Sequence, residues 1–243
     1  MFRPRIIPCL QLSNGALVKT KAFRDPVYVG DPLNATMIFS ECAADELLVI
    51  GIDAPEPPWD VLQRIAGMCT APLTYGGGIR DIEQIARLIH LGIEKVSINA
   101  AALNDAAFIR AAADRFGSQC IVVSMDVRGE GERAKVFGKR GHEPTAWTAV
   151  EYARHAQAYG AGELLVTSVD REGGMQGYDL PLIRALSGAV NIPIIAHGGA
   201  GTLNDMHAAI DAGASAAAAG SMFVFHKRRG AVLIQMPLPA ECP

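Results

Sequence analysis

Several features that mark particular classes of protein are missing from this chain of 243 residues. Half of the residues are hydrophobic, yet no apolar run of roughly 18 or more lacks a charge, so the sequence predicts no membrane span. The first residues carry Arg5 and lead directly into an apolar strand, without the layout of a signal peptide. The formal net charge of −3 shows no basic excess, which argues against nucleic acid as the main partner. We therefore expect a cytoplasmic protein.

Cysteine is scarce and scattered. The five cysteines show no CxxC spacing, which fits reduced thiols better than a disulfide framework or a zinc site. The carboxylates Asp170 and Glu172 come close together in the sequence, but no cluster of histidine or cysteine with ligand spacing accompanies them. The sequence therefore predicts neither a metal nor another cofactor.

What the chain does contain is an internal repeat. The segment 74–101 runs parallel to 195–222, at an offset of 195 − 74 = 121 residues, close to half of the 243. DELLVIGID at 45–53 likewise matches GELLVTSVD at 162–170. A repeat of this length is too long for a solenoid and indicates a duplicated half-domain.

Short apolar runs alternate with helical patterns along the chain. The predicted strands cover 6–12, 46–52, 73–75, 95–99, 121–126, 163–168, 193–197 and 216–220, and helical stretches between them include 81–91, 105–116, 146–159 and 203–212. Strands that alternate with helices indicate parallel βαβ units, and eight of them fit an α/β fold, the (β/α)8 TIM barrel built from two similar half-barrels. A doubly wound open sheet is the alternative, which the duplication disfavours. Because no linker divides the chain, residues 1–243 are expected to form a single domain.

Glycine-rich loops follow the third and seventh predicted strands, GGGIR at 76–80 and GGAG at 198–201. Glycine lets backbone N–H groups approach an anion closely, and a following helix N-terminus adds a favourable dipole. The repeat adds Asn99 to the first loop and Gly220 with Ser221 to the second. Two such loops half a barrel apart predict a ligand with a phosphate at each end, although the glycines could also serve only tight turns.

These residues carry a family resemblance. The chain resembles HisF, the cyclase subunit of imidazole glycerol phosphate synthase, over almost its whole length, with matching stretches that include DRFGSQCIVV, GAGELLVTSVDREG and IPIIAHGGAG. The resemblance implies that a HisH-like glutaminase docks on the N-terminal face of the barrel. It also implies that ammonia crosses the barrel interior and reacts at the mouth with a bisphosphorylated nucleotide, where two aspartates act as general acid and base.

One member of that catalytic pair is absent. Asp126 matches the strand-5 aspartate, but Gln11 stands at the strand-1 position, and a carboxamide cannot act as a general acid or base. Further departures are Gly51 for an aspartate, Ala100 for a hydroxyl residue, Glu172 for an aspartate and His197 for a serine. The positions expected to bind phosphate or the rest of the ligand are Lys19, Gly77, Gly78, Asn99, Thr167, Asp170, Gly198, Gly199, Gly220 and Ser221.

A ring of charges at the base of the predicted barrel is retained in full. Arg5, Glu46, Lys95 and Glu163 match the residues that gate the ammonia entrance in the HisF family. Taken from the sequence alone, two positive and two negative charges could equally form a structural salt-bridge cluster, because residues at the bottom face of a barrel usually serve stability. The resemblance favours the interpretation that these four residues gate the entry of ammonia.

The chain therefore resembles the HisF-like paralogues that accompany amidation of bacterial cell-surface sugars (the WbuZ type). The expected function is to receive ammonia from the glutaminase and channel it towards amidation of a surface-polysaccharide sugar. An amidotransferase would be the third component, and a phosphorylated small molecule the ligand. Two alternatives stay open. One is a genuine cyclase of histidine biosynthesis with an unusual Gln11, and the other is a non-catalytic scaffold that activates the glutaminase.

Overall fold

The computed structural model describes residues 4–53, 55–225 and 231–236. Within them, eight parallel strands form a closed ring in the order β1 (Arg5–Ser13), β4 (Leu47–Gly51), β5 (Leu73–Gly76), β6 (Lys95–Ile98), β7 (Ile121–Arg128), β10 (Glu163–Ser168), β11 (Ile194–His197) and β12 (Ala216–Ala219). The ring closes where β12 pairs with β1, from Arg5 opposite Ala216 to Pro8 opposite Ala219. The predicted TIM barrel is therefore confirmed, and the open sheet is excluded.

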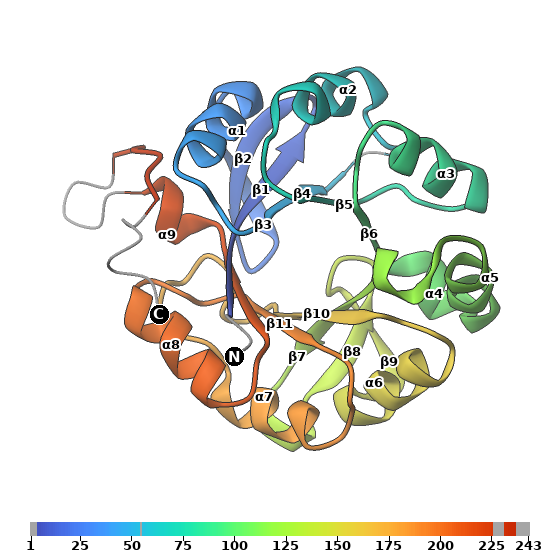
Figure 1. Cartoon of the computed structure of the whole chain (residues 1–243). Coiled ribbons are helices and arrows are strands. Elements are labelled where there is room, and N and C mark those ends of the chain that lie inside the picture. The colour runs from blue at the N-terminus through green and yellow to red at the C-terminus, as the bar shows by residue number, and fades with distance from the viewer. Residues whose placement is uncertain (1–3, 54, 226–230, 237–243) are drawn as a thin grey trace.

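Helices surround the barrel on its outside (Figure 1). They are α1 (Pro32–Glu41), α2 (Trp59–Met68), α3 (Ile82–His90), α4 (Ala100–Asn104), α5 (Ala106–Phe116), α6 (Ala149–Ala158), α7 (Leu180–Ser187), α8 (Leu203–Asp211) and α9 (Ser221–Val224). Each longer helix buries an apolar stripe, as α3 does with Ile85 and Leu88. No helix in the described part of the chain is long and apolar enough to cross a membrane.

The period-two alternation of the strands creates two separate cores. Along β1, Leu10 and Leu12 belong to the core between the sheet and the helices, whereas Ile7 and Cys9 belong to a smaller cluster inside the barrel. Near-continuous apolar strands such as β1 and β7 are explained by this arrangement, because both faces of a barrel strand are covered. The inner face then carries side chains in layers from the base to the mouth.

Two antiparallel hairpins extend the barrel at equivalent positions of the two halves. β2 (Ala16–Lys21) and β3 (Arg24–Gly30) follow β1, and β8 (Lys135–Gly138) and β9 (Glu143–Thr148) follow β7. The hairpins are absent from the sequence-based prediction, which also began the helix at 146–159 too early, since residues up to Thr148 belong to β9. Their matching positions show that the duplication includes these hairpins.

Candidate functional site

Inward-facing side chains form a column from the base of the barrel to its mouth. On β1 the column is Arg5, Ile7, Cys9 and Gln11, spaced two residues apart on the same face. The interior between base and mouth is apolar and consists of Ile7, Cys9, Leu48, Val122, Leu165, Ile195, Ala216 and Ala218, with Ile50 packed against them. A single strand thus links a charged base, an apolar interior and a polar mouth.

The four predicted gate residues form one closed ring of ion pairs at the base. Arg5 contacts Glu46 Oε2 at 2.5 Å and Glu163 Oε1 at 3.1 Å, and Lys95 Nζ lies 3.0 and 3.2 Å from the same two carboxylates. Thr74 Oγ1 donates a 2.6 Å hydrogen bond to the second oxygen of Glu46. Burial alone would lower the pKa of the Arg5 guanidinium, but Glu163 and Glu46 outweigh burial and raise that pKa above its ordinary value. Each positive charge is therefore shared between two negative ones.

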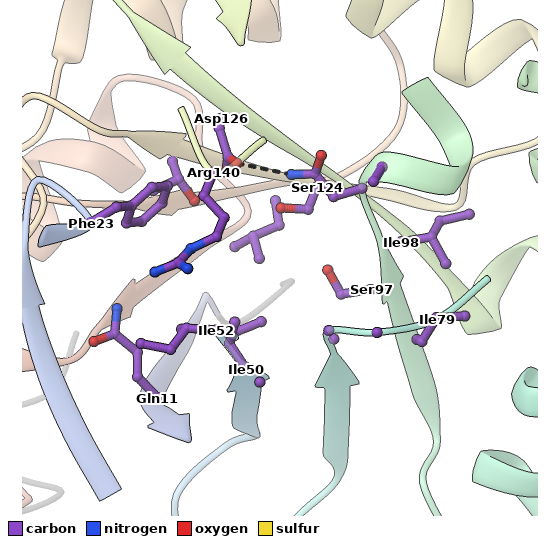
Figure 2. A pocket seen from close by; sticks show the side chains of 18 of the residues that line it. Gln11, Phe23, Ile50, Ile52, Ile79, Ser97, Ile98, Ser124, Asp126 and Arg140 are labelled. Atoms are coloured by element: carbon purple, nitrogen blue, oxygen red, sulfur yellow. Dashed lines mark hydrogen bonds between the residues drawn. The ribbon is translucent and has the colours of Figure 1, made fainter. Parts of the chain in front are cut away.

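A cavity of about 340 Å³ opens at the other end of the barrel (Figure 2). Its walls come from the carboxyl ends of β1, β4, β5, β6, β7, β10 and β11, where barrel active sites are built. Among the charged residues of the lining, Asp126 is negative, and Arg80, Lys139 and Arg140 are positive. The described residues contain no group of three His, Cys, Asp or Glu side chains that could hold a metal ion.

Asp126 is the titratable acid of this cavity. It is 7% exposed and accepts a 3.1 Å hydrogen bond from Asn99 Nδ2. Burial raises its pKa to about 7, against the opposing effects of the Asn99 hydrogen bond and the Arg140 charge. A carboxyl group with a pKa near neutrality can both give and take a proton, so Asp126 is equipped for acid–base chemistry.

Gln11, by contrast, is held in a buried polar network. Its Nε2 donates to Glu172 Oε1 at 3.0 Å, and its Oε1 accepts from the backbone N–H of Thr20 at 3.2 Å. Glu172 also accepts from the Thr20 hydroxyl at 2.8 Å and from the Phe23 backbone N–H at 3.0 Å. Gln11 and Glu172, which the resemblance marks as departures from the expected aspartates, are therefore direct partners, and the carboxamide of Gln11 has no pKa that suits general acid–base catalysis.

Neighbouring residues at the mouth are also buried, and burial shifts their pKa values in the direction that favours the uncharged form. The Thr167 hydroxyl lies 3.0 Å from His197 Nδ1, and burial lowers the pKa of His197 to about 4, which leaves the ring neutral at pH 7. Lys19 Nζ donates to the Cys9 carbonyl at 2.6 Å, and burial lowers the pKa of this lysine. Burial raises the pKa of the Cys9 thiol to about 11, so the thiol is not a nucleophile.

The first glycine loop lines the main cavity. Gly77 and Gly78, together with Asn99, contribute to its wall. Gly77 has φ +117°, and a Cβ there would lie 2.2 Å from the Gly51 carbonyl oxygen, so only glycine allows this close approach. A Cβ at position 51 would lie 2.8 Å from the Tyr75 hydroxyl, so a side chain there would require Tyr75 to move.

The second glycine loop repeats this geometry around a much smaller space. Gly199 also has φ +117°, and its Cβ would lie 2.2 Å from a carbonyl oxygen, that of Gly177. The pocket here is about 20 Å³, little more than one water needs. The structure brings together in its lining the predicted residues Lys19, Gly198, Gly199, Gly220 and Ser221, with Gln11, Glu172 and His197 beside them. The two predicted phosphate sites are thus unequal, one open and one closed.

Asp170 does not reach either pocket. Its carboxylate pairs with Arg128 at 2.5 Å and accepts from the Gly129 backbone N–H at 3.2 Å, on the outer rim. In this structure the side chain ties the end of β7 to the loop after β10, and its expected contact with the ligand stays a prediction. The sequence reading missed Phe23, Arg80 and Arg140, which all line the cavity. Phe23 and Arg140 come from the unpredicted hairpins, so no sequence signal placed them there.

Fold and site together define a (β/α)8 barrel with a ring of paired charges at its base and a cavity lined by a glycine-rich loop at its mouth. The chain matches the family described as "Histidine biosynthesis protein" over residues 5–229. It is 44% identical, over 98% of its length and 97% of the relative, to a Pseudomonas aeruginosa protein described as "Putative imidazole glycerol phosphate synthase subunit hisF2". It is 43% identical to "Imidazole glycerol phosphate synthase subunit HisF" of Hyphomonas neptunium, over 93% of this chain and 91% of the relative. The chain therefore belongs to the histidine biosynthesis protein family, among the HisF homologues.

Proposed function

We propose that this HisF homologue receives ammonia from a HisH-like glutaminase and passes it through the barrel to the cavity at the mouth. The observation that carries the proposal is the combination of a complete charged ring with a mouth that has lost one acid–base group. Arg5, Glu46, Lys95 and Glu163 are all present and mutually paired, whereas Gln11 is engaged by Glu172. Delivery of ammonia needs the first feature and not the second.

The interior supports transport of a small neutral molecule. Ammonia must travel as NH3, because NH4+ would pay a large desolvation penalty among Ile7, Leu48, Val122 and the other apolar side chains of the interior. A ring of buried charges is costly unless its members pair, and paired charges leave no free cation or anion to trap a passing molecule. The ring can therefore separate bulk water from the interior and still open for a small neutral guest.

As the acceptor of the ammonia we propose a bacterial surface-polysaccharide sugar. An amidotransferase, the third component of the system, would amidate this sugar. The support is indirect. The mouth departs from the cyclase pattern at Gln11, Gly51 and Glu172, and one relative is described as a hisF2 subunit. We further propose that a phosphorylated ligand binds at Gly77, Gly78 and Asn99. Binding at Gly199 and Ser221 would require the smaller pocket to expand.

A genuine cyclase of histidine biosynthesis is the second candidate, favoured by Asp126 with its pKa near 7 and by the 43% identity to a HisF subunit. The purified chain, supplied with ammonia and the cyclase bisphosphate substrate, decides between the two. Loss of one general acid or base typically slows a reaction by roughly 10²–10⁴-fold, so we expect very little turnover. Robust turnover would establish the cyclase and remove the amidation proposal.

The ammonia route is tested with Lys95→Ala in the complex with the glutaminase. This change leaves Glu46 and Glu163 without one of their two cations and opens the ring, while Arg5 still bridges both carboxylates. We expect the glutaminase to bind with unchanged affinity and glutamine hydrolysis to continue. The ratio of ammonia delivered at the mouth to glutamine hydrolysed should fall severalfold.

Arg115→Ala is the matched control, because Arg115 pairs with Glu83 on the exposed outer surface of the barrel. It deletes one cation of one ion pair and should leave the coupling ratio unchanged. If Lys95→Ala also leaves that ratio unchanged, or if the glutaminase binds away from the base, the route through the barrel is wrong. The remaining interpretation would then be a scaffold that activates the glutaminase.

A further inference from the structure

The tip of the second hairpin adopts an unusual backbone conformation over the cavity. Lys139, Arg140 and Gly141 connect β8 to β9, and all three have left-handed φ values, +46°, +59° and +76°. Only glycine adopts this region without cost, so Lys139 and Arg140 are held there by their surroundings. Strained backbone of this kind concentrates at functional sites, where the structure around it fixes an otherwise unfavourable geometry.

Contacts on both sides of Arg140 fix the tip. Arg128 Nε donates to the Gly141 carbonyl at 2.7 Å, and Lys139 Nζ pairs with Glu143 at 2.6 Å. The His142 backbone N–H closes the turn on the Gly138 carbonyl at 3.1 Å. The anchored turn leaves Arg140 to extend into the cavity, with its guanidinium towards the wall that carries Phe23 and Gln11 (Figure 2).

Among the described residues, the Arg140 guanidinium has no hydrogen-bond or ion-pair partner, and it acts on Asp126 only through longer-range electrostatic attraction. It lines the cavity that contains the carboxyl group of Asp126. Asp126 is instead hydrogen-bonded to Asn99 at 3.1 Å. The charge of Lys139 is matched by Glu143, so Arg80 and Arg140 are the two cations of the lining that exceed the single carboxylate of Asp126. An electropositive cavity with an unpaired planar cation suits an anionic group of the ligand.

We propose that Arg140 binds an oxyanion, a carboxylate or a phosphate, that the ligand carries in addition to the phosphate held by the glycine loop. A guanidinium presents two parallel N–H donors that match the two oxygens of such a group. Asp126 does not oppose this contact while it is protonated, which its raised pKa of about 7 permits near neutral pH. The Ser97 hydroxyl, buried in the cavity wall without a partner among the described residues, offers a further donor to a polar ligand. The inference rests on the proposed function only in requiring a phosphorylated ligand.

Calorimetric titration with three matched hexitol derivatives tests the assignment. 6-Phosphogluconate carries a carboxylate at the end opposite its phosphate, glucitol 6-phosphate carries a hydroxyl there, and glucitol 1,6-bisphosphate carries a second phosphate. A hydrogen-bonded charge pair is commonly worth roughly tenfold or more in affinity. We expect the protein to bind at least one of the two compounds that carry a second anionic group about tenfold more tightly than glucitol 6-phosphate. The tighter of the two identifies the oxyanion as carboxylate or phosphate.

Arg140→Asn should abolish this preference and leave the affinity for glucitol 6-phosphate unchanged, since asparagine tolerates the left-handed backbone of the turn. Arg140→Lys should keep part of the preference for the compounds with a second anionic group, because lysine retains the positive charge. Lys139→Asn is the matched control, because it removes a cation from the adjacent position that already pairs with Glu143. Equal binding of all three compounds, or a preference that survives Arg140→Asn, would overturn the assignment. Binding of none would refute this ligand class, whereas the proposal of ammonia delivery is judged separately by the Lys95 coupling ratio.

Discussion

Replacing Gln11 with aspartate tests whether the mouth of the barrel can simply be returned to the cyclase pattern. The structure predicts that it cannot. Gln11 Nε2 donates to Glu172 Oε1 at 3.0 Å, and both residues are nearly inaccessible to solvent, at 3% and 4% exposed. Gln11→Asp removes the donor and places a second carboxylate beside the first. The variant should therefore be destabilised, and its cyclase activity should remain low.

The magnitude follows from two contributions. A lost hydrogen bond to a charged group costs about 1.5–3 kcal/mol. Two negative charges about 4 Å apart repel by about 4 kcal/mol at an effective dielectric constant of 20. The repulsion is limited, because two carboxylates this close can share one proton. We therefore expect a total loss of about 3–5 kcal/mol at neutral to alkaline pH, a large part of the stability of an ordinary domain.

The pH dependence has a definite sign. In the folded Gln11→Asp variant the two adjacent carboxyl groups share one proton, which the unfolded chain releases at about pH 4. The pKa of this carboxyl pair is therefore higher in the folded state than in the unfolded state. Stability of the variant relative to wild type must then fall as the pH rises above the unfolded value. Urea unfolding at about pH 5 and about pH 8 measures this difference. Gln11→Asn, equally short but neutral, is the control for shape.

The double variant Gln11→Asp with Glu172→Gln provides the decisive comparison. It restores one carboxylate and one amide in exchanged positions, so it should recover much of the stability that Gln11→Asp loses. Non-additivity of this kind is expected only for residues in direct contact. If Gln11→Asp is as stable as Gln11→Asn at about pH 8, the two carboxylates do not interact, and the reasoning from the observed hydrogen bond is wrong.

Two further changes test the acid at the mouth and the ring at the base. Because burial raises the pKa of Asp126 to about 7, its ionisation costs stability as the pH rises from the unfolded value through 7. Asp126→Asn should therefore raise the free energy of unfolding by a few kcal/mol at about pH 8 and little at about pH 4. Thr74→Val removes the 2.6 Å hydrogen bond to Glu46 and should cost about 1–3 kcal/mol in urea unfolding. Thr74→Ser, which keeps the hydroxyl, should cost less.

The barrel strands were predictable because their signal is local and strong. A strand buried on both faces is almost continuously apolar, as in β7, and the duplication indicated where the equivalent strand should lie. The first hairpin gave no such signal. Its two-residue turn is Ala22–Phe23, both with left-handed φ, where asparagine and glycine are the usual residues. The turn is held instead by distant groups, since Ala22 and Phe23 donate to the backbone and side chain of Glu172.

The same long-range dependence limited what the sequence could say of the site. Gln11 was recognised as an exception to the repeat, but its partner Glu172 lies 161 residues away and looked like an independent change. Arg140 could not be placed in the cavity without the hairpin that carries it. Asp170 was placed there by analogy with its repeat partner, yet Arg128 draws its carboxylate to the outer rim. Sequence identifies residue types at strand ends, and tertiary contacts decide where their side chains point.

The distance along the barrel explains how its two ends can change independently. Arg5 and Gln11 lie on one strand six residues apart, so roughly 20 Å separates base from mouth at about 3.3 Å per residue. The side chains between them are mostly apolar, and the polar ones, Ser97 and Ser124, are uncharged. Substitutions this far apart are normally additive. A substitution at the mouth, such as Gln11 in place of a carboxylate, is therefore expected to leave the base ring intact, as the proposed function requires of a barrel that delivers ammonia without cyclase chemistry.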